Sequence, residues 1–313
     1  MALLEVQNLK VDYLLRGAWW SKRKYLHAVD DVSFTVDRGE TVGLVGESGC
    51  GKSSIAKALV RLENPSGGTV KIGDVDIAQL SGKALRKARK NFQMVFQDPY
   101  GSLNPRLSIQ SALDEVLKLH TSLDKDARLQ RMRELMIMVG LNPDTLSRYP
   151  HQFSGGQRQR IGIARALAAE PELLIADEPV SALDVSVQAQ IINLLNDLRK
   201  KMDLTVLFIA HDLSVVKYFS DRIGVMYLGK LVELAPAQEL FARPLHPYTK
   251  SLLSAIPLPD PRRERQRKRI RYDPAQDHDY SVQEPSFRQM WPGHWVRCND
   301  REMEKMIKEA EGV

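Results

Sequence analysis

The sequence has few cysteines and no long apolar run, and each shortage excludes a class of protein. Of the 313 residues only Cys50 and Cys298 are cysteines, so a disulfide-bonded framework is not expected. No apolar stretch approaches the roughly 20 residues needed to cross a bilayer. The opening segment, MALLEVQNLKVDY, carries charges where a signal peptide needs an apolar core. We therefore expect a cytosolic chain that reaches a membrane only through partners.

The excess of positive charge lies in one segment. The formal net charge is +6, and residues 262–271, RRERQRKRIR, hold seven basic side chains and one acidic one. Such a segment is open to three interpretations: contact with anionic lipid, binding to nucleic acid, or a solvated linker after the proline-rich IPLPDP. No recognisable nucleic-acid reader motif accompanies the segment, so nucleic acid is not expected as a partner.

Residues 46–53, GESGCGKS, match the phosphate-loop pattern G-x-x-x-x-G-K-[ST]. A strand-like run over 41–45 precedes the loop and a helix-like stretch over 53–62 follows it, which disfavours a glycine-rich turn without a ligand. Glycines let backbone N–H groups converge on phosphate oxygens at a helix N-terminus. Lys52 would reach the β- and γ-phosphates, and Ser53 would ligate Mg²⁺. The residues expected to bind the nucleotide here are Gly46, Glu47, Ser48, Gly49, Cys50, Gly51, Lys52, Ser53 and Ser54.

A short apolar run, LLIA at 173–176, ends in Asp177-Glu178. It has no room for a polar face and predicts a strand buried on both sides of a parallel sheet. Taken alone, such a strand more often precedes a solvated turn, but α/β sheets place their ligands at the carboxyl ends of strands. With the phosphate loop present, we expect Asp177 to hold Mg²⁺ and Glu178 to polarise the attacking water.

A third strand-like run, residues 204–210, ends in His211-Asp212. A lone histidine after a strand is usually a surface residue or a hydrogen-bonded one. This strand end should meet the same edge of the sheet as Asp177 and Glu178, so we expect His211 to contact the γ-phosphate.

Residues 153–157, FSGGQ, predict a second anion site. Ser154, Gly155 and Gly156 offer a hydroxyl and bare backbone amides at the start of a helix expected over about 157–169. A plain N-capped helix accounts for the serine but not for two glycines followed by glutamine. One chain has no second phosphate loop for this site to face.

Together these residues resemble the ATP-binding subunits of ABC transporters. The matching segments occur in the family's order: GESGCGKS, Gln97 after a strand at 91–96, FSGGQRQR at 153–160, LLIADE, SALD at 181–184, and His211. The resemblance covers about residues 3–235. Phe153 stands where leucine is commonest, an apolar exchange that leaves Ser154 and the two glycines intact.

The resemblance implies an α/β fold with a RecA-like P-loop core, an antiparallel β subdomain, a helical signature subdomain and a C-terminal extension. The nucleotide-binding domain would span 1–235, with the helical subdomain at about 98–165, and the extension 236–313. Helical patterns at 109–120 and 125–139 agree with it. Residues 166–233 are expected to complete the sheet, and the rest to form a tail.

The resemblance also assigns further site residues. Ser154, Gly155, Gly156 and Gln157 would close on the ATP of another subunit's phosphate loop, with Asp184 at the same interface, so the active unit would be a head-to-tail pair holding two ATPs. Gln97 would bind Mg²⁺ and report the nucleotide state to membrane subunits. Lys52, Glu178 and His211 would be catalytic. Tyr13 would stack on adenine, with Tyr25 as a rival because 14–27 looks like an inserted loop.

Three segments point to a substrate class. PLHPYTKSLLSAIPLP at 244–259, QDPYGSLNPR at 97–106 and PVSALDVSVQAQIINLL at 179–195 resemble ATPases of oligopeptide and dipeptide importers. The first should form a short amphipathic helix packed on the core. The resemblance implies two permeases, a substrate-binding protein and usually a second, different ATPase, at the cytoplasmic face of the membrane. Nickel or oligosaccharide import stays an alternative. Some relatives hold an iron–sulfur cluster near the C-terminus, but with Cys298 alone there none is expected.

Other roles fit less well. Soluble ABC ATPases that act on ribosomes or DNA usually carry two nucleotide-binding halves or a very long insertion, and neither is present. A non-hydrolysing regulatory subunit is disfavoured because Lys52, Glu178 and His211 are all present. Export is disfavoured by the importer-like C-terminal segment. One chain leaves open whether the pair is a homodimer or a heterodimer, although the resemblance favours the heterodimer.

Overall fold

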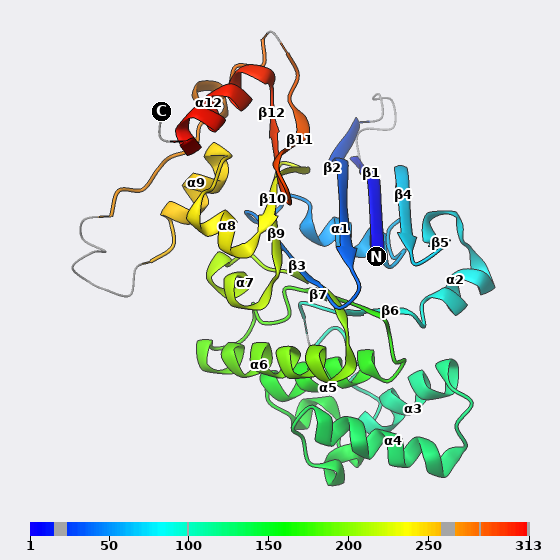
Figure 1. Ribbon diagram of the computed structural model, residues 1–313. Coiled ribbons are helices and arrows are strands. Elements are labelled where there is room, and N and C mark those ends of the chain that lie inside the picture. Colours follow the sequence, from blue (N-terminus) through cyan, green and yellow to red (C-terminus); the bar gives the residue numbers. More distant parts are fainter. Residues whose placement is uncertain (16–23, 99, 258–266, 282, 312–313) are drawn as a thin grey trace.

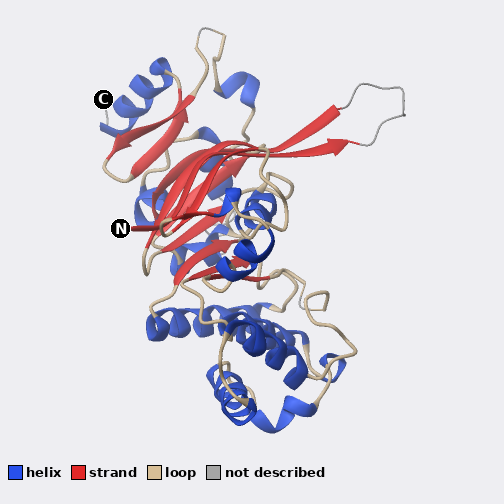
Figure 2. Cartoon of the chain, turned by 90° about the vertical axis from the view of Figure 1, so that its right-hand side faces the viewer, coloured by secondary structure: helices blue, strands red, loops and turns tan. Residues whose placement is uncertain are grey.

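The computed structural model describes residues 1–15, 24–98, 100–257, 267–281 and 283–311. Two sheets form the middle of the molecule, and a group of helices lies at one end of them (Figures 1 and 2). The larger sheet has the strand order β11-β12-β10-β9-β3-β8-β7-β6. Its parallel strands are β3 (Thr41–Val45), β6 (Phe92–Val95), β7 (Leu173–Asp177), β8 (Thr205–Ile209) and β9 (Arg222–Tyr227), and β6 forms one edge of the sheet.

Strands β3, β7 and β8 are buried along their whole length. Alternate residues enter two different apolar clusters, so that Leu174 and Ala176 pack on one face of the sheet and Leu173 and Ile175 on the other. Burial on both faces explains the continuous apolar runs in the sequence. Because the strands are parallel, their carboxyl ends meet at one edge, as expected for a ligand site.

The smaller sheet is antiparallel, with the order β2-β1-β4-β5. Its strands are β1 (Ala2–Leu15), β2 (Lys24–Asp37), β4 (Gly67–Ile72) and β5 (Val75–Asp76). Helix α1 (Lys52–Leu59) shares one apolar cluster with both sheets. The expected antiparallel subdomain is therefore present. Of the inserted loop expected at 14–27, residues 14–15 and 24–27 belong instead to β1 and β2, where 24–27 pair with residues 12–15, while 16–23 lie outside the described residues.

The helical region begins after β6 and forms one end of the molecule (Figure 1). A 3₁₀ turn (Ile77–Gln79) and α2 (Gly82–Ala88) precede that strand. The region contains α3 (Ile109–His120), α4 (Lys125–Met138), 3₁₀ turns at Pro143–Ser147 and Pro150–Gln152, and α5 (Gly155–Leu167), and β7 then leads to α6 (Val185–Met202). Ser108 and Asp124 cap α3 and α4 through their side chains. These boundaries agree with the helical patterns in the sequence.

The C-terminal extension is joined to the core sheet, which contradicts the expectation that residues 166–233 complete it. The core ends with α7 (Leu213–Phe219), β9 and β10 (Lys230–Pro236). The extension then contains α8 (Ala237–Ala242), α9 (Pro247–Ser254), α11 (Pro274–Asp277), β11 (Ser286–Trp291), β12 (His294–Cys298) and α12 (Asp300–Glu311). Strand β12 pairs with β10, and β11 pairs with β12. The hairpin therefore covers what would otherwise be an exposed sheet edge.

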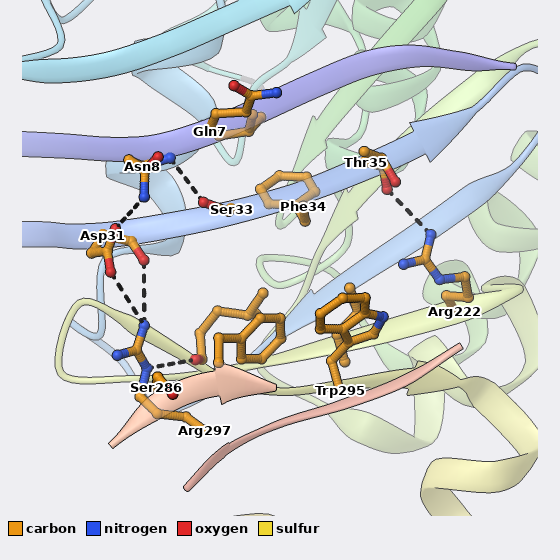
Figure 3. Close-up of a pocket in the computed structure, with 14 residues that line it drawn as sticks. Gln7, Asn8, Asp31, Ser33, Phe34, Thr35, Arg222, Ser286, Trp295 and Arg297 are labelled. Carbon is orange, nitrogen blue, oxygen red and sulfur yellow. Dashed lines mark hydrogen bonds and ion pairs between the residues drawn. The ribbon is translucent and has the colours of Figure 1, made fainter. Parts of the chain in front are cut away.

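A groove between the antiparallel sheet and this hairpin shows how the extension is attached (Figure 3). Arg297 crosses it, donating hydrogen bonds to the carbonyl oxygens of Leu231, Pro285 and Asp31 at 3.2–3.4 Å. Phe287 and Trp295 stack on the same side of the groove, with ring centroids 5.9 Å apart.

Of the basic segment at 262–271, residues 262–266 lie outside the described residues. Over the residues that are described, no helix combines the length and apolar composition needed to cross a membrane.

Candidate nucleotide-binding site

The phosphate loop joins β3 to α1, and the structure explains two of its glycines. A Cβ atom at Gly46 would lie 2.2 Å from the carbonyl oxygen of Met226, and one at Gly51 would lie 2.2 Å from that of Ala28. Gly51 also has a φ of 106°, which side-chain-bearing residues rarely adopt. The loop is therefore wedged between neighbouring backbone segments, and larger residues could not reproduce its course.

Lys52 begins α1 and turns its side chain back into the loop. Its ammonium group is buried and donates hydrogen bonds to the carbonyl oxygens of Gly46 at 2.7 Å and Glu47 at 2.9 Å. The loop thus gathers a positive charge beside backbone amides at a helix N-terminus, an arrangement suited to phosphate. Cys50 is buried beside it, and this burial raises the pKa of its thiol.

Ser53 and Asp177 join the phosphate loop to the end of β7. The Ser53 hydroxyl donates a 2.9 Å hydrogen bond to Oδ1 of Asp177. Burial raises the pKa of the Asp177 carboxyl, against the smaller lowering effect of the Ser53 hydrogen bond. A buried carboxylate beside a hydroxyl is a hard oxygen donor set of the kind that suits Mg²⁺, and a divalent cation would offset the cost of burying the charge.

Glu178, Gln97 and His211 meet at the same edge of the sheet. Gln97 donates from Nε2 to Oε2 of Glu178 at 2.9 Å, and Nδ1 of His211 lies 3.8 Å from that oxygen. Glu178 has a φ of 45°, and its N–H donates to the carbonyl oxygen of Ile209 on β8. A left-handed glutamate is costly and is typical of functional sites, where the surrounding structure holds it in place.

A cavity adjoins these residues. It is lined by Ser53, Lys57, Phe96, Gln97, Asp98, Gly101, Ser102 and Asp177. Two charged members, Lys57 and Asp98, were not among the residues expected from the sequence. Lys57 lies one helical turn after Ser53, so the helix period offered a signal for it, whereas Asp98 differs little from any polar residue that follows a strand.

Of the two candidate adenine-binding aromatics, only Tyr13 lies beside the phosphate-loop helix. Its hydroxyl donates to Oγ of Ser54 at 3.3 Å, and its ring is partly buried against the core. Tyr25 is 48% exposed and pairs with Leu14 farther along the β1–β2 ribbon. Tyr13 is therefore the one of the two that contacts the phosphate-loop helix.

The signature segment lies apart from these groups, at the start of α5. The helix begins at Gly155, two residues earlier than expected, and Ser154 and Gln157 cap it reciprocally. A Cβ atom at Gly156 would lie 2.5 Å from Cγ1 of Val187 on α6, so close helix packing accounts for that glycine. Asp184, just before α6, is exposed and makes no side-chain cap.

Comparison with known proteins agrees with this geometry. The ABC transporter family model matches residues 29–181, and the model for the oligopeptide/dipeptide transporter C-terminal region matches residues 232–282. The chain is 54% identical to the oligopeptide transport ATP-binding protein OppF of Bacillus subtilis, over 96% of this chain and 97% of that one. It is 50% identical to OppF of Streptococcus mutans, over 96% of each.

Solved structures show the same fold. The dimeric ATP-binding cassette MJ0796, in a post-hydrolysis state bound to ADP and Pi, matches with a TM-score of 0.66 and 30% identity, covering 75% of this chain and 98% of that one. CbiO1 of Clostridium perfringens matches with the same score and 27% identity, over 77% and 91%. The RecA-like cassette fold is therefore confirmed. With relatives matched over nearly its whole length, the chain belongs to the ATP-binding proteins of ABC transporters.

Proposed function

We propose that this chain hydrolyses ATP to power the import of oligopeptides or dipeptides across the cytoplasmic membrane. The observation that carries the proposal is the 54% identity to an oligopeptide transport ATP-binding protein over nearly the whole chain, extension included. The match of residues 232–282 to the oligopeptide/dipeptide C-terminal region supports the same substrate class. Nickel or oligosaccharide import would use the same ATPase chemistry.

We infer a task for each side chain in that chemistry. Lys52 exchanges its loop carbonyls for the β- and γ-phosphate oxygens, because a phosphate is a better partner for a buried ammonium group than a neutral carbonyl. Glu178 accepts a proton from the attacking water, with Gln97 orienting the carboxylate. His211, close to the same carboxylate, contacts the γ-phosphate. These side chains would mainly position the reacting groups and stabilise the charge that develops on the phosphates.

We infer that Ser53, Asp177 and Gln97 would hold Mg²⁺. Their hydroxyl, carboxylate and amide oxygens are the donor types that this ion prefers. An Mg²⁺ ion held by these residues would supply positive charge to the phosphates. The Ser53–Asp177 hydrogen bond keeps the first two ligands together before any ion arrives.

The active unit would be a head-to-tail pair of cassettes. The signature serine and glutamine hydrogen-bond with each other at the start of α5, and the serine and Asp184 face solvent. A second chain would bring its nucleotide to this helix N-terminus, where amides and a hydroxyl stabilise phosphate. Two permeases, a second ATPase and a substrate-binding protein would complete the transporter. The chain would sit peripherally at the cytoplasmic face of the membrane.

Isolation of the complex tests the proposal. The tagged chain is captured from detergent-solubilised membranes of its own host, and its companions are identified by mass spectrometry. We expect two permeases, a second cassette and a binding protein, with ATP hydrolysis stimulated by that binding protein only when it carries peptide. The Lys52→Ala complex should assemble equally and hydrolyse far less. Stimulation by nickel or oligosaccharide alone, or capture of ribosomal or DNA-repair proteins, would contradict the peptide assignment.

A further inference from the structure

A hydrogen bond joins the C-terminal extension to the phosphate loop. The N–H of Glu47, the second residue of the loop, donates a 3.1 Å hydrogen bond to the hydroxyl of Tyr248 on α9. These residues are 201 positions apart in the chain. Tyr248 is 2% exposed, so its side chain is shielded from water. The segment around Tyr248, which in the sequence pointed only to the transporter class, therefore contacts the candidate nucleotide site directly.

Helix α9 is held in place by a buried carboxylate. Glu233 on β10 is fully buried and accepts hydrogen bonds from the backbone N–H groups of Leu245 at 2.8 Å and His246 at 3.0 Å. Nε2 of His294, on β12, lies 2.8 Å from the same carboxylate. Buried charge with several partners resists displacement, because any movement leaves it unpaired. The N-terminus of α9 is thus fixed to the sheet and to the C-terminal hairpin.

The tyrosine ring is fixed as well. The backbone N–H of Tyr248 donates a hydrogen bond to Nδ1 of His246. This imidazole is neutral because burial lowers its pKa to about 3. Tyr227 and Tyr272 pack against the ring with centroids 4.5 and 5.3 Å away. Burial raises the pKa of the Tyr248 hydroxyl, which keeps it neutral. A neutral hydroxyl in a rigid setting is an anchor for a backbone amide.

Glu47 is held on both sides. Tyr248 accepts from its N–H, and Lys52 donates to its carbonyl oxygen at 2.9 Å. When Lys52 turns to phosphate, the carbonyl contact is lost and the tyrosine contact remains. We propose that Tyr248 is a positioning residue through which the C-terminal extension holds the phosphate loop in its nucleotide-binding shape. This inference rests on the proposed ATP site.

The test replaces the hydroxyl and keeps the ring. Tyr248→Phe is made in the full-length chain, with Tyr272→Phe as the matched control, since that hydroxyl lies 2.9 Å from Nε2 of His278 instead of the loop. We expect Tyr248→Phe to raise the KM for ATP about three- to tenfold, the effect of losing one hydrogen bond. The kcat should change less than about twofold, and Tyr272→Phe should leave KM near the wild-type value.

A second measurement separates positioning from structural support. Amide hydrogen exchange of the 46–53 peptide should quicken in Tyr248→Phe without ATP and stay near wild type in Tyr272→Phe. If Tyr248→Phe lowers Tm while KM, loop exchange and ATP-induced stabilisation match the wild type, the residue only supports the fold and the inference is wrong. Equal rises in KM for both variants would also overturn it. Absence of ATP binding by the wild-type chain would instead remove the proposed function beneath it.

Discussion

The phosphate loop and the signature segment are built alike but completed differently. Each offers backbone amides at a helix N-terminus, next to a short hydroxyl side chain. The phosphate loop finds partners inside the chain: Lys52 bonds to loop carbonyls, Ser53 to Asp177, and Glu47 to Tyr248. The signature residues Ser154 and Gln157 hydrogen-bond to each other. The phosphate loop is therefore built into a site within its own chain, whereas we expect the signature segment to act only when a second chain faces it.

The difference predicts how mutations should behave. A change on the phosphate-loop side should affect what a single chain does with nucleotide. A change on the signature side should leave single-chain binding intact and act only when two cassettes meet. Four substitutions test that division.

Glu178→Gln should have the largest effect. The amide keeps the size of the side chain but cannot accept the proton of the attacking water, so hydrolysis should fall on the order of 10²- to 10⁴-fold. ATP affinity should change less than about threefold, because the phosphate contacts come from other groups. Phosphate release and nucleotide titration measure the two quantities. Glu172→Gln, on an exposed side chain paired with Arg38, is the control. Retained hydrolysis in Glu178→Gln would refute the assignment.

Ser154→Ala tests the signature side. It removes a helix cap and the hydroxyl offered to a second chain's nucleotide. Ser108→Ala removes an equivalent cap on α3, and each loss costs about 1 kcal/mol of stability. Only Ser154→Ala should lower hydrolysis by the assembled transporter, by about tenfold, since a hydrogen bond to a charged group is lost.

Single-chain ATP affinity decides the comparison. It should match the wild type in both serine variants. If Ser154→Ala weakens ATP binding by an isolated chain as strongly as it slows the assembled transporter, the signature acts on its own chain's nucleotide and the division is wrong.

The contrast also shows what the sequence could reveal. The limits of β3 and α3 matched the expected 41–45 and 109–120, because short apolar runs and capped periodic helices are local signals. Ser53, Asp177 and His211 could be placed at one edge because the carboxyl ends of parallel strands must meet there. These inferences need only local pattern and one rule of topology.

What the sequence missed depends on distant pairing. Strand β12 joins the sheet by pairing Glu233 with Val296. The local sequence around either residue gives no signal of this pairing. The hydrogen bond between Glu47 and Tyr248 is hidden for the same reason. The left-handed backbone of Glu178 is set by its neighbours rather than by its type, since glutamate does not favour that conformation. Long-range contacts and local strain are therefore the part that required coordinates.

Tyr13→Ala should have a smaller effect, again on the single chain. Losing an aromatic contact to adenine should raise the Kd for ATP roughly fivefold, as stacking contributes about 0.5–1.5 kcal/mol. Tyr25→Ala removes a ring of similar size from the exposed ribbon and should leave Kd within about twofold of the wild type. Titration with ATP and with inorganic triphosphate separates base from phosphate binding. Equal losses of affinity for ATP and for inorganic triphosphate would place Tyr13 on the phosphates instead.

Asp177→Asn should have the smallest effect, a change in the melting temperature of the chain without nucleotide. The direction of this change tests whether the buried carboxylate opposes folding. Burial raises the pKa of Asp177 above its ordinary 3.8, so the ionised carboxylate opposes folding. Relative to full protonation, stability present below the unfolded pKa is lost as pH rises through the folded pKa. At pH 7 the Asn variant should therefore melt about 1–3 °C higher than the wild type, and this gain should disappear at a pH below 3.8.

Melting curves of the empty chain at several pH values, with the exposed Asp197→Asn as control, measure that gain. In Asp177→Asn, the stabilisation that MgATP gives the wild type should be lost, because Mg²⁺ then lacks its buried carboxylate. A variant that melts lower than the wild type at pH 7, yet gains fully from MgATP, would show that Asp177 serves the fold and not the ion. The carboxylate would then belong with the structural contacts of β7, and the phosphate-loop half of the site would lack its main charge for the metal.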